Sequence, residues 1–200
     1  MTGSSSSPIL EVCVETIQQG LLAENKNADR IEFCHRLDLG GVTPDHDLIR
    51  SAVNTIKIPV KIMIRPRGGD FIYSDSEVDK MKSDIRYCKS IGVEEVVLGA
   101  LNEDGEVDNR LTQRLAKLAF PMKVTFHKAI DAVNNFMSSL KTLSTMENID
   151  SVLTSGTKEN ALAGKEYIKL ASKEFTGLLN IIAAGSITSQ NLKEIHSELN

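Results

Sequence analysis

The sequence predicts a single-domain α/β protein with a (β/α)8 barrel of the TIM type, in which seven β/α units are visible and the eighth strand is missing at the C-terminus. Three observations lead to this prediction. Short apolar segments recur about every thirty residues, the residues between them have a helical period, and ionisable residues interrupt the apolar segments on one side. An open doubly wound sheet is the alternative, although seven regular units are more than a flavodoxin-like sheet needs.

The predicted strands are short apolar segments whose centres lie 21 to 34 residues apart. A strand, a loop and a helix of ten to fifteen residues fill a period of about that length. Apolar residues follow a spacing of three and four residues from Val78 to Cys88 and again from Val107 to Leu118, which predicts one-faced helices against a sheet. In chain order the strands are ILEVCV, RIEFC, VKIMI, EVVLG, KVTFH, SVLTSG and LNIIAAG.

No linker or break in composition divides the chain, so residues 9–200 are predicted to form one barrel domain. Residues 1–8 are expected to be a flexible N-terminal tail. The eighth strand of a closed barrel is expected to follow residue 200.

The overall composition excludes several classes of function. The net charge of −4, the pI near 5.6 and an aromatic content of 4% argue against nucleic acid as a partner. No apolar run is long enough to span a bilayer, so a membrane is not an expected partner either. Three cysteines without an export signal indicate reduced thiols in the cytoplasm rather than disulfides. We further expect a homo-oligomer.

Ionisable residues occupy inward-facing positions of the predicted strands. Alternate strand residues of a barrel face its lumen, and the chemistry lies at the C-terminal ends of the strands. Buried parallel strands usually consist almost entirely of Val, Ile and Leu, so these exceptions indicate a function. A salt-bridge network that closes the barrel floor is the structural alternative. The catalytic candidates expected to converge there are Glu11, Glu32, Arg65, His127 and Asp131.

Arg65 stands at the end of a buried strand, in the segment KIMIRPRGGDF. An arginine in this position needs an anionic partner. We expect its guanidinium to face Glu11, Glu32 or a bound anion. Arg67 and Asp70 are expected in the loop above, with glycines in the turn between them; a solvent-exposed charge is the alternative for Arg67.

One interpretation of this lumen is an enzyme for proton transfer or lyase chemistry on a small anionic metabolite. His127 and Asp131 would move the proton, and Arg65 would hold the anion with two parallel hydrogen bonds. Loops after the sixth and seventh strands offer backbone N–H groups at helix starts, although ordinary helix capping explains them as well. No nucleotide-cofactor motif occurs. The expected ligand-binding positions are Arg67, Asp70, Thr125, Lys128, Thr154, Ser155, Gly156, Gly185 and Ser186.

The other interpretation is a copper site at Cys13 and Cys34. Both residues have inward parity near the ends of adjacent strands, which lie about 4.8 Å apart. Two soft sulfurs favour Cu(I), whereas zinc prefers four tetrahedral ligands. The alternative is that both cysteines are small buried apolar residues, which is the expectation for Cys88. A third class of function, a purely structural barrel, would need no charged residues facing the lumen.

Six segments of the chain resemble one family. In order they are EVCVE, ADRIEFC, GGVTP, MIRPRGGDFIYSD, VTFHKAID and VLTSG. They are similar to the CutC family, described as copper-homeostasis proteins with a TIM-barrel fold. The resemblance implies a Cu(I)-binding protein of the cytoplasm. The chain departs from the family at Lys128, where arginine is usual, and at Ile130, where phenylalanine is usual; the segment AAGSI stands in place of a glycine-rich turn.

Overall fold

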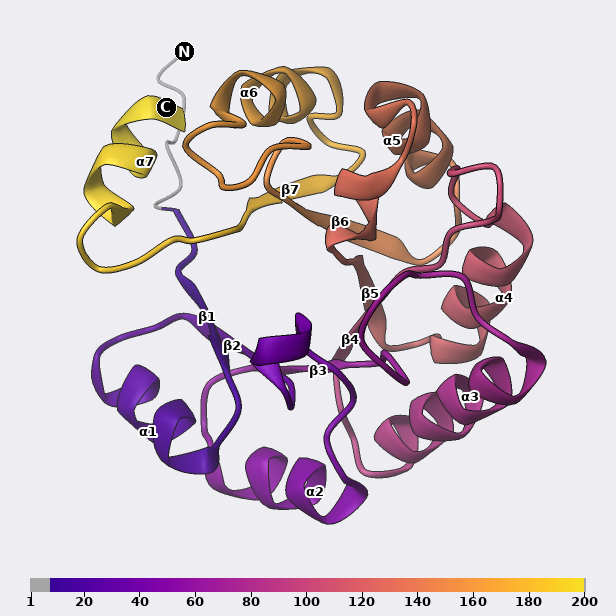
Figure 1. The fold of residues 1–200 in the computed structure, drawn as a ribbon. Helices are drawn as coiled ribbons and strands as arrows, with labels where there is room; N and C mark the ends of the chain where they lie inside the picture. Colours follow the sequence, from indigo (N-terminus) through magenta and orange to yellow (C-terminus); the bar gives the residue numbers. More distant parts are fainter. Residues whose placement is uncertain (1–7, 200) are drawn as a thin grey trace.

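The computed structural model describes residues 8–199. Seven strands form one parallel sheet in the sequential order β1 to β7, and the strands curve around a common centre with the helices outside (Figure 1). The strands are β1 (Glu11–Val14), β2 (Arg30–Phe33), β3 (Val60–Met63), β4 (Glu95–Leu98), β5 (Lys123–Phe126), β6 (Ile149–Thr154) and β7 (Asn180–Ala183).

A helix follows each strand. The two predicted from apolar spacing are both present, as α3 and α4. The helices are α1 (Ile17–Asn25), α2 (His46–Thr55), α3 (Asp75–Ser90), α4 (Asn109–Ala119), α5 (Phe136–Ser144), α6 (Lys165–Glu174) and α7 (Leu192–Leu199), with short 3-10 helices η1 (Leu37–Leu39) and η2 (Lys128–Ala132).

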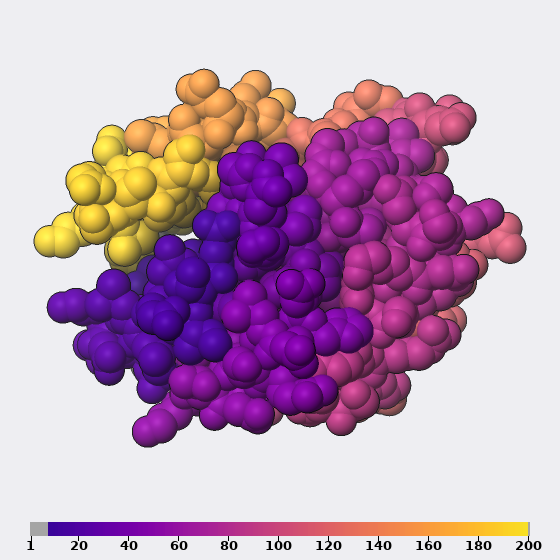
Figure 2. Space-filling model, turned by 60° about the horizontal axis from the view of Figure 1, so that its bottom comes forward, coloured from indigo at the N-terminus to yellow at the C-terminus, as the bar shows by residue number. Residues whose placement is uncertain are grey.

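This strand order confirms the β/α barrel type and excludes the doubly wound alternative. A doubly wound sheet reverses its strand order at a switch point, whereas here every strand pairs with its neighbour in sequence. Within residues 8–199, β1 and β7 are each paired on one side only. Figure 2 shows α7 and the first β/α unit on the same side of the molecule. The strand expected after residue 200, and the predicted tail apart from Pro8, lie outside the described residues.

The main apolar core lies between the sheet and the helices. Most outward-facing residues of β2 to β6 are buried there, because parallel strands under helices have no solvent-exposed face. Two helices begin with reciprocal capping boxes, Thr16 with Gln19 at α1 and Ser74 with Glu77 at α3. No helix within residues 8–199 combines the length and apolarity that a bilayer span requires. The strand residues of this core include Ile31, Ile62, Val96, Val124 and Val152.

The register brings the inward-facing residues of four strands into one row. Cys13 pairs with Glu32, Glu32 with Lys61, and Lys61 with Glu95. Arg65 lies two residues beyond the end of β3, and His127 directly follows β5. The lumen therefore has a polar row within the sheet and a second polar group at its C-terminal mouth.

Candidate functional site

Cys13 and Cys34 lie close together on the first two strands. Their Sγ atoms are 3.6 Å apart, and the Cys13 Sγ is also 3.6 Å from Oε1 of Glu32. Cys34 is fully buried beside Met63 and Val97, whereas Cys13 is exposed on β1, which is paired on one side only within residues 8–199. Soft metal–sulfur bonds are about 2.3 Å long, so two sulfurs at this separation can both reach one ion.

The surroundings of the Cys13 thiol favour its protonated form. The hydrogen bond with Cys34 raises the pKa of Cys13, and the negative charge of Glu32 acts in the same direction. Burial raises the pKa of Glu32 to about 7, and the neighbouring Glu11 adds to this effect. A metal ion bound here would therefore displace protons, because it binds thiolates rather than thiols.

Lys61, which the sequence analysis did not single out, is the centre of a buried ionic network. Its side chain is only 1% exposed, and Nζ lies 3.0 Å from Oε2 of Glu11 and 2.7 Å from Oε1 of Glu95. Nζ also donates to Oγ1 of Thr125 at 3.0 Å, and Arg30 forms a second ion pair with Glu11. Lys61 lies an even number of residues before Arg65 and therefore faces the lumen as Arg65 does. This spacing could have indicated the position of Lys61.

This network corrects the expected convergence of the catalytic candidates. Glu11 is the first residue of β1 and is held by Lys61 and Arg30, whereas Arg65 lies beyond the other end of β3. Glu11 and Thr125 thus belong to the ionic network within the sheet. A salt-bridge network was the structural alternative to a catalytic role for the inward-facing charges. Glu32 lies beside Cys13.

Asp131 is bound by the loop after β6. Its carboxylate accepts hydrogen bonds from the backbone N–H of Ser155 at 2.9 Å and of Thr157 at 3.0 Å, and from the hydroxyl groups of Thr154 and Ser155. Lys128 lies 3.4 Å from the same carboxylate. Several donors that were expected to bind an external anion therefore bind a carboxylate of the chain itself.

The remaining loop positions surround this arrangement. Lys128 also donates to Oγ of Ser155, and the backbone N–H of Gly156 donates to Oγ1 of Thr154. A Cβ atom on Gly185 would lie 3.1 Å from the Lys128 Nζ, so this glycine permits close approach. The Ser186 carbonyl accepts a hydrogen bond from the side chain of Asn191.

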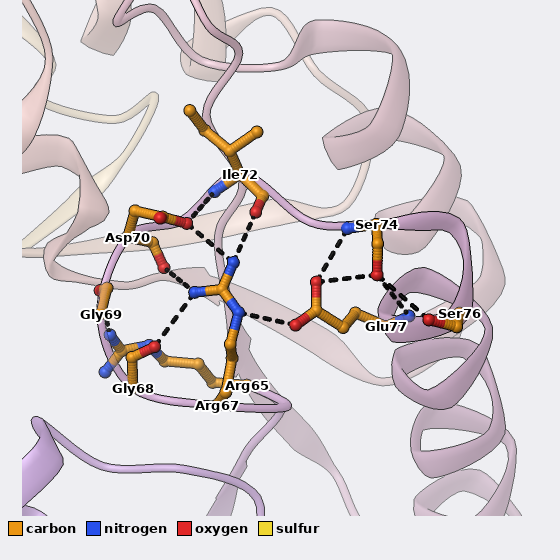
Figure 3. Close-up of polar contacts among 9 residues, drawn as sticks. All are labelled: Arg65, Arg67, Gly68, Gly69, Asp70, Ile72, Ser74, Ser76 and Glu77. Atoms are coloured by element: carbon orange, nitrogen blue, oxygen red, sulfur yellow. Dashed lines mark hydrogen bonds and ion pairs between the residues drawn. The ribbon is translucent and has the colours of Figure 1, made fainter.

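Arg65 faces backbone carbonyls rather than a glutamate, contrary to expectation. Nη1 donates to the carbonyl oxygens of Leu39, Gly40 and Gly41. Nη2 donates to the carbonyl oxygen of Gly69 at 2.7 Å, and Figure 3 shows these two residues. The guanidinium thereby joins the loop after β2 to the loop after β3. Both terminal nitrogens therefore hold the two loops, and Nε is the nitrogen without a partner within the described residues.

Arg67 and Asp70 hold their own loop together. Arg67 donates from Nε to Glu77 at 2.6 Å, from Nη2 to Asp70 at 2.8 Å, and to the carbonyl of Ile72 (Figure 3). Glu77 in turn accepts from the backbone N–H of Ser74 as part of the α3 capping box. These bonds fix the start of α3 relative to the mouth of the barrel.

His127 is a neutral histidine at that mouth. Its side chain is 3% exposed, and its Nδ1 accepts a hydrogen bond from the backbone N–H of Ala129, which places the proton on Nε2. Burial lowers the pKa of His127 to about 3, and the positive charge of Arg65 acts in the same direction. The ring lies 5.0 Å from that of Phe71.

Replacing His127 by asparagine is expected to weaken the acid sensitivity of the fold. The unfolded chain protonates this histidine near pH 6.5, whereas the folded chain does so only near pH 3. The stabilisation is therefore complete above about pH 6.5 and is lost as the pH falls, by about 2 kcal/mol at pH 5. Urea unfolding at pH 7 and pH 5 measures the difference. The exposed His35, replaced in the same way, is the control, and an equal pH response in both variants would refute the expectation.

The sequence and the fold of this chain match known proteins. The chain matches the CutC family over residues 8–199. The chain belongs to the CutC family. The human copper homeostasis protein cutC homolog is 42% identical over 193 residues, which cover 96% of this chain and 70% of that protein. A CutC family protein of Pasteurella multocida is 39% identical over 182 residues, covering 91% of this chain and 74% of that protein.

Solved structures extend the comparison with the CutC family. The putative copper homeostasis protein CutC from Streptococcus agalactiae superposes with a TM-score of 0.88 at 26% identity, covering 96% of this chain and 95% of that one. A putative lyase/mutase from Burkholderia cenocepacia has a TM-score of 0.63 at 11% identity, covering 96% of this chain and 75% of that one. The second likeness shows the shared fold alone.

Proposed function

We propose that this CutC protein binds one Cu(I) ion between Cys13 and Cys34 as part of copper homeostasis. The observation that carries the proposal is the 3.6 Å separation of the two Sγ atoms. Thiolates are the soft ligands that select Cu(I), and no group of three or more His, Cys, Asp or Glu side chains suited to a metal occurs within residues 8–199. The relatives named for copper homeostasis support the same function.

The position of the two thiols suits uptake and release of an ion. Cys13 is exposed and would meet the incoming ion, whereas Cys34 is buried and would complete the pair from inside. Because both thiols must lose their protons, the affinity should rise with pH. Reduced thiols are kept in the cytoplasm, which we propose as the location, and a homo-oligomer is the proposed state.

X-ray absorption of the Cu(I)-loaded protein tests this proposal. The expected first shell around copper contains two sulfur atoms, since both thiolates bind one ion. A Cys88→Ala variant is the control, because Cys88 is buried on α3 away from the pair and its loss should leave the spectrum unchanged. A shell of nitrogen or oxygen alone would rule out the two-thiolate site.

An enzyme for proton transfer or lyase chemistry on a small anionic metabolite is the second candidate function. The observation in its favour is that Arg65 and the neutral His127 are both buried at the mouth, where barrel enzymes act. Such an enzyme would first have to bind its anion there, so a mouth that binds no anion would remove this candidate.

A further inference from the structure

Arg65 is a buried cation that no carboxylate neutralises within residues 8–199. It is 4% exposed, and its hydrogen bonds go to neutral backbone carbonyls. Other buried or half-buried cations differ in this respect, since Lys61, Arg67 and Lys128 each form an ion pair with a carboxylate. A buried charge without a counter-charge is costly, so the mouth of the barrel favours an anion from outside the chain.

Three buried polar atoms at this mouth have no hydrogen-bond partner within the described residues. They are Nε of Arg65, Nε2 of His127 and the hydroxyl oxygen of Tyr73. Buried polar groups are nearly always paired, so each such atom needs an explanation. Three such atoms at the same end of the barrel call for a common explanation.

The side chains that carry these atoms are neighbours. The Arg65 guanidinium carbon lies 4.7 Å from the centre of the Phe71 ring, and the His127 ring lies 5.0 Å from the same ring. The positive charge of Arg65 also acts on both other groups, lowering the pKa of His127 and opposing the burial that raises the pKa of Tyr73 to about 12. Arg65 and His127 therefore flank Phe71, and Tyr73 follows Phe71 by two residues in the same loop.

All three atoms can donate a hydrogen bond. Arginine has only donors, His127 has its proton on Nε2 because Nδ1 already accepts from Ala129, and Tyr73 keeps its phenolic proton at neutral pH. A water molecule accepts from at most two of them and carries no charge to neutralise Arg65. An oxyanion accepts from all three and also neutralises Arg65.

We propose that Arg65, Tyr73 and His127 form a binding site for a small oxyanion, a carboxylate or a phosphate, at the mouth of the barrel. Each side chain supplies one hydrogen bond. Arg65 contributes through Nε, because its terminal nitrogens hold the loops after β2 and β3. The site is separate from the thiol pair, so its occupancy does not depend on copper.

Calorimetric titration of the full chain with inorganic phosphate and with acetate tests the site, with chloride at equal ionic strength as the reference. Saturable binding of either anion is expected. Tyr73→Phe removes one hydroxyl, and His127→Asn removes the Nε2 donor while an asparagine oxygen still accepts from Ala129. Each variant should weaken binding about tenfold. Phosphate alone or acetate alone would identify the class of ligand, and either result supports the site.

Tyr87→Phe is the matched control, because the Tyr87 hydroxyl already donates to the carbonyl of His46 on another part of the molecule. Its affinity for the anion should stay within about twofold of the native value. The imidazole resonance of His127, followed in the native chain and in Tyr73→Phe, reports binding at the site itself. No saturable binding by the native chain, or equal binding by all three variants, overturns the proposal. The Cys13→Ser/Cys34→Ser variant should bind the anion as the native chain does, whatever the outcome for copper.

Discussion

Replacing Lys61 by methionine is expected to lower the free energy of unfolding by about 3–5 kcal/mol at neutral pH. Lys61 Nζ touches the carboxylates of Glu11 and Glu95 and the hydroxyl of Thr125, and its side chain is 1% exposed. Methionine fills a similar volume but removes the charge, which leaves Glu95 without its ion-pair partner and Glu11 with Arg30 alone. An uncompensated buried charge costs far more than the ion pair itself contributes.

Urea unfolding followed by circular dichroism measures this effect. Lys117→Met is the matched control, because its ion pair with Glu147 is exposed and should contribute less than about 1 kcal/mol. Adding Glu95→Gln to Lys61→Met should recover part of the lost stability, since Glu95 is then neutral whereas Glu11 keeps its ion pair with Arg30. A loss no larger than that of the control would show that Lys61 is not the counter-charge of this network.

The fold could be predicted from the sequence because its signals are local and repeated. The β/α period and the one-faced spacing in α3 and α4 depend only on neighbouring residues, and the structure confirms both. Parity along each strand also placed Cys13 and Cys34 on the lumen side, and their contact follows from the pairing of β1 with β2. The contact between the two thiols could therefore be predicted from the sequence.

The partners of charged residues could not be predicted in the same way. Parity says which face a side chain occupies but not its height along the barrel, so Glu11 was expected beside Arg65 although it pairs with Lys61. The carbonyl partners of Arg65 come from the irregular loops around Gly40 and Gly69, whose backbone course no spacing rule predicts. Tyr73 gave no signal at all, since it lies in a loop without a period.

Replacing both Cys13 and Cys34 by serine is expected to lower the affinity for Cu(I) on the order of a thousandfold or more, because two hard hydroxyl oxygens replace two soft thiolates. Each single variant should also weaken binding strongly, because one remaining sulfur cannot hold the ion by itself. Serine has nearly the size of cysteine, so the packing around Met63 and Val97 should change little. An unchanged unfolding midpoint would separate lost binding from lost structure.

The most direct test of the copper site is a titration of Cu(I) against a coloured Cu(I) chelator under reducing conditions. The native chain and Cys88→Ala are expected to withdraw one Cu(I) ion per chain from the chelator, whereas Cys13→Ser/Cys34→Ser is expected to withdraw none. The same affinity in the native chain and the double variant would contradict the assignment of copper to the two thiols, whose Sγ atoms lie 3.6 Å apart.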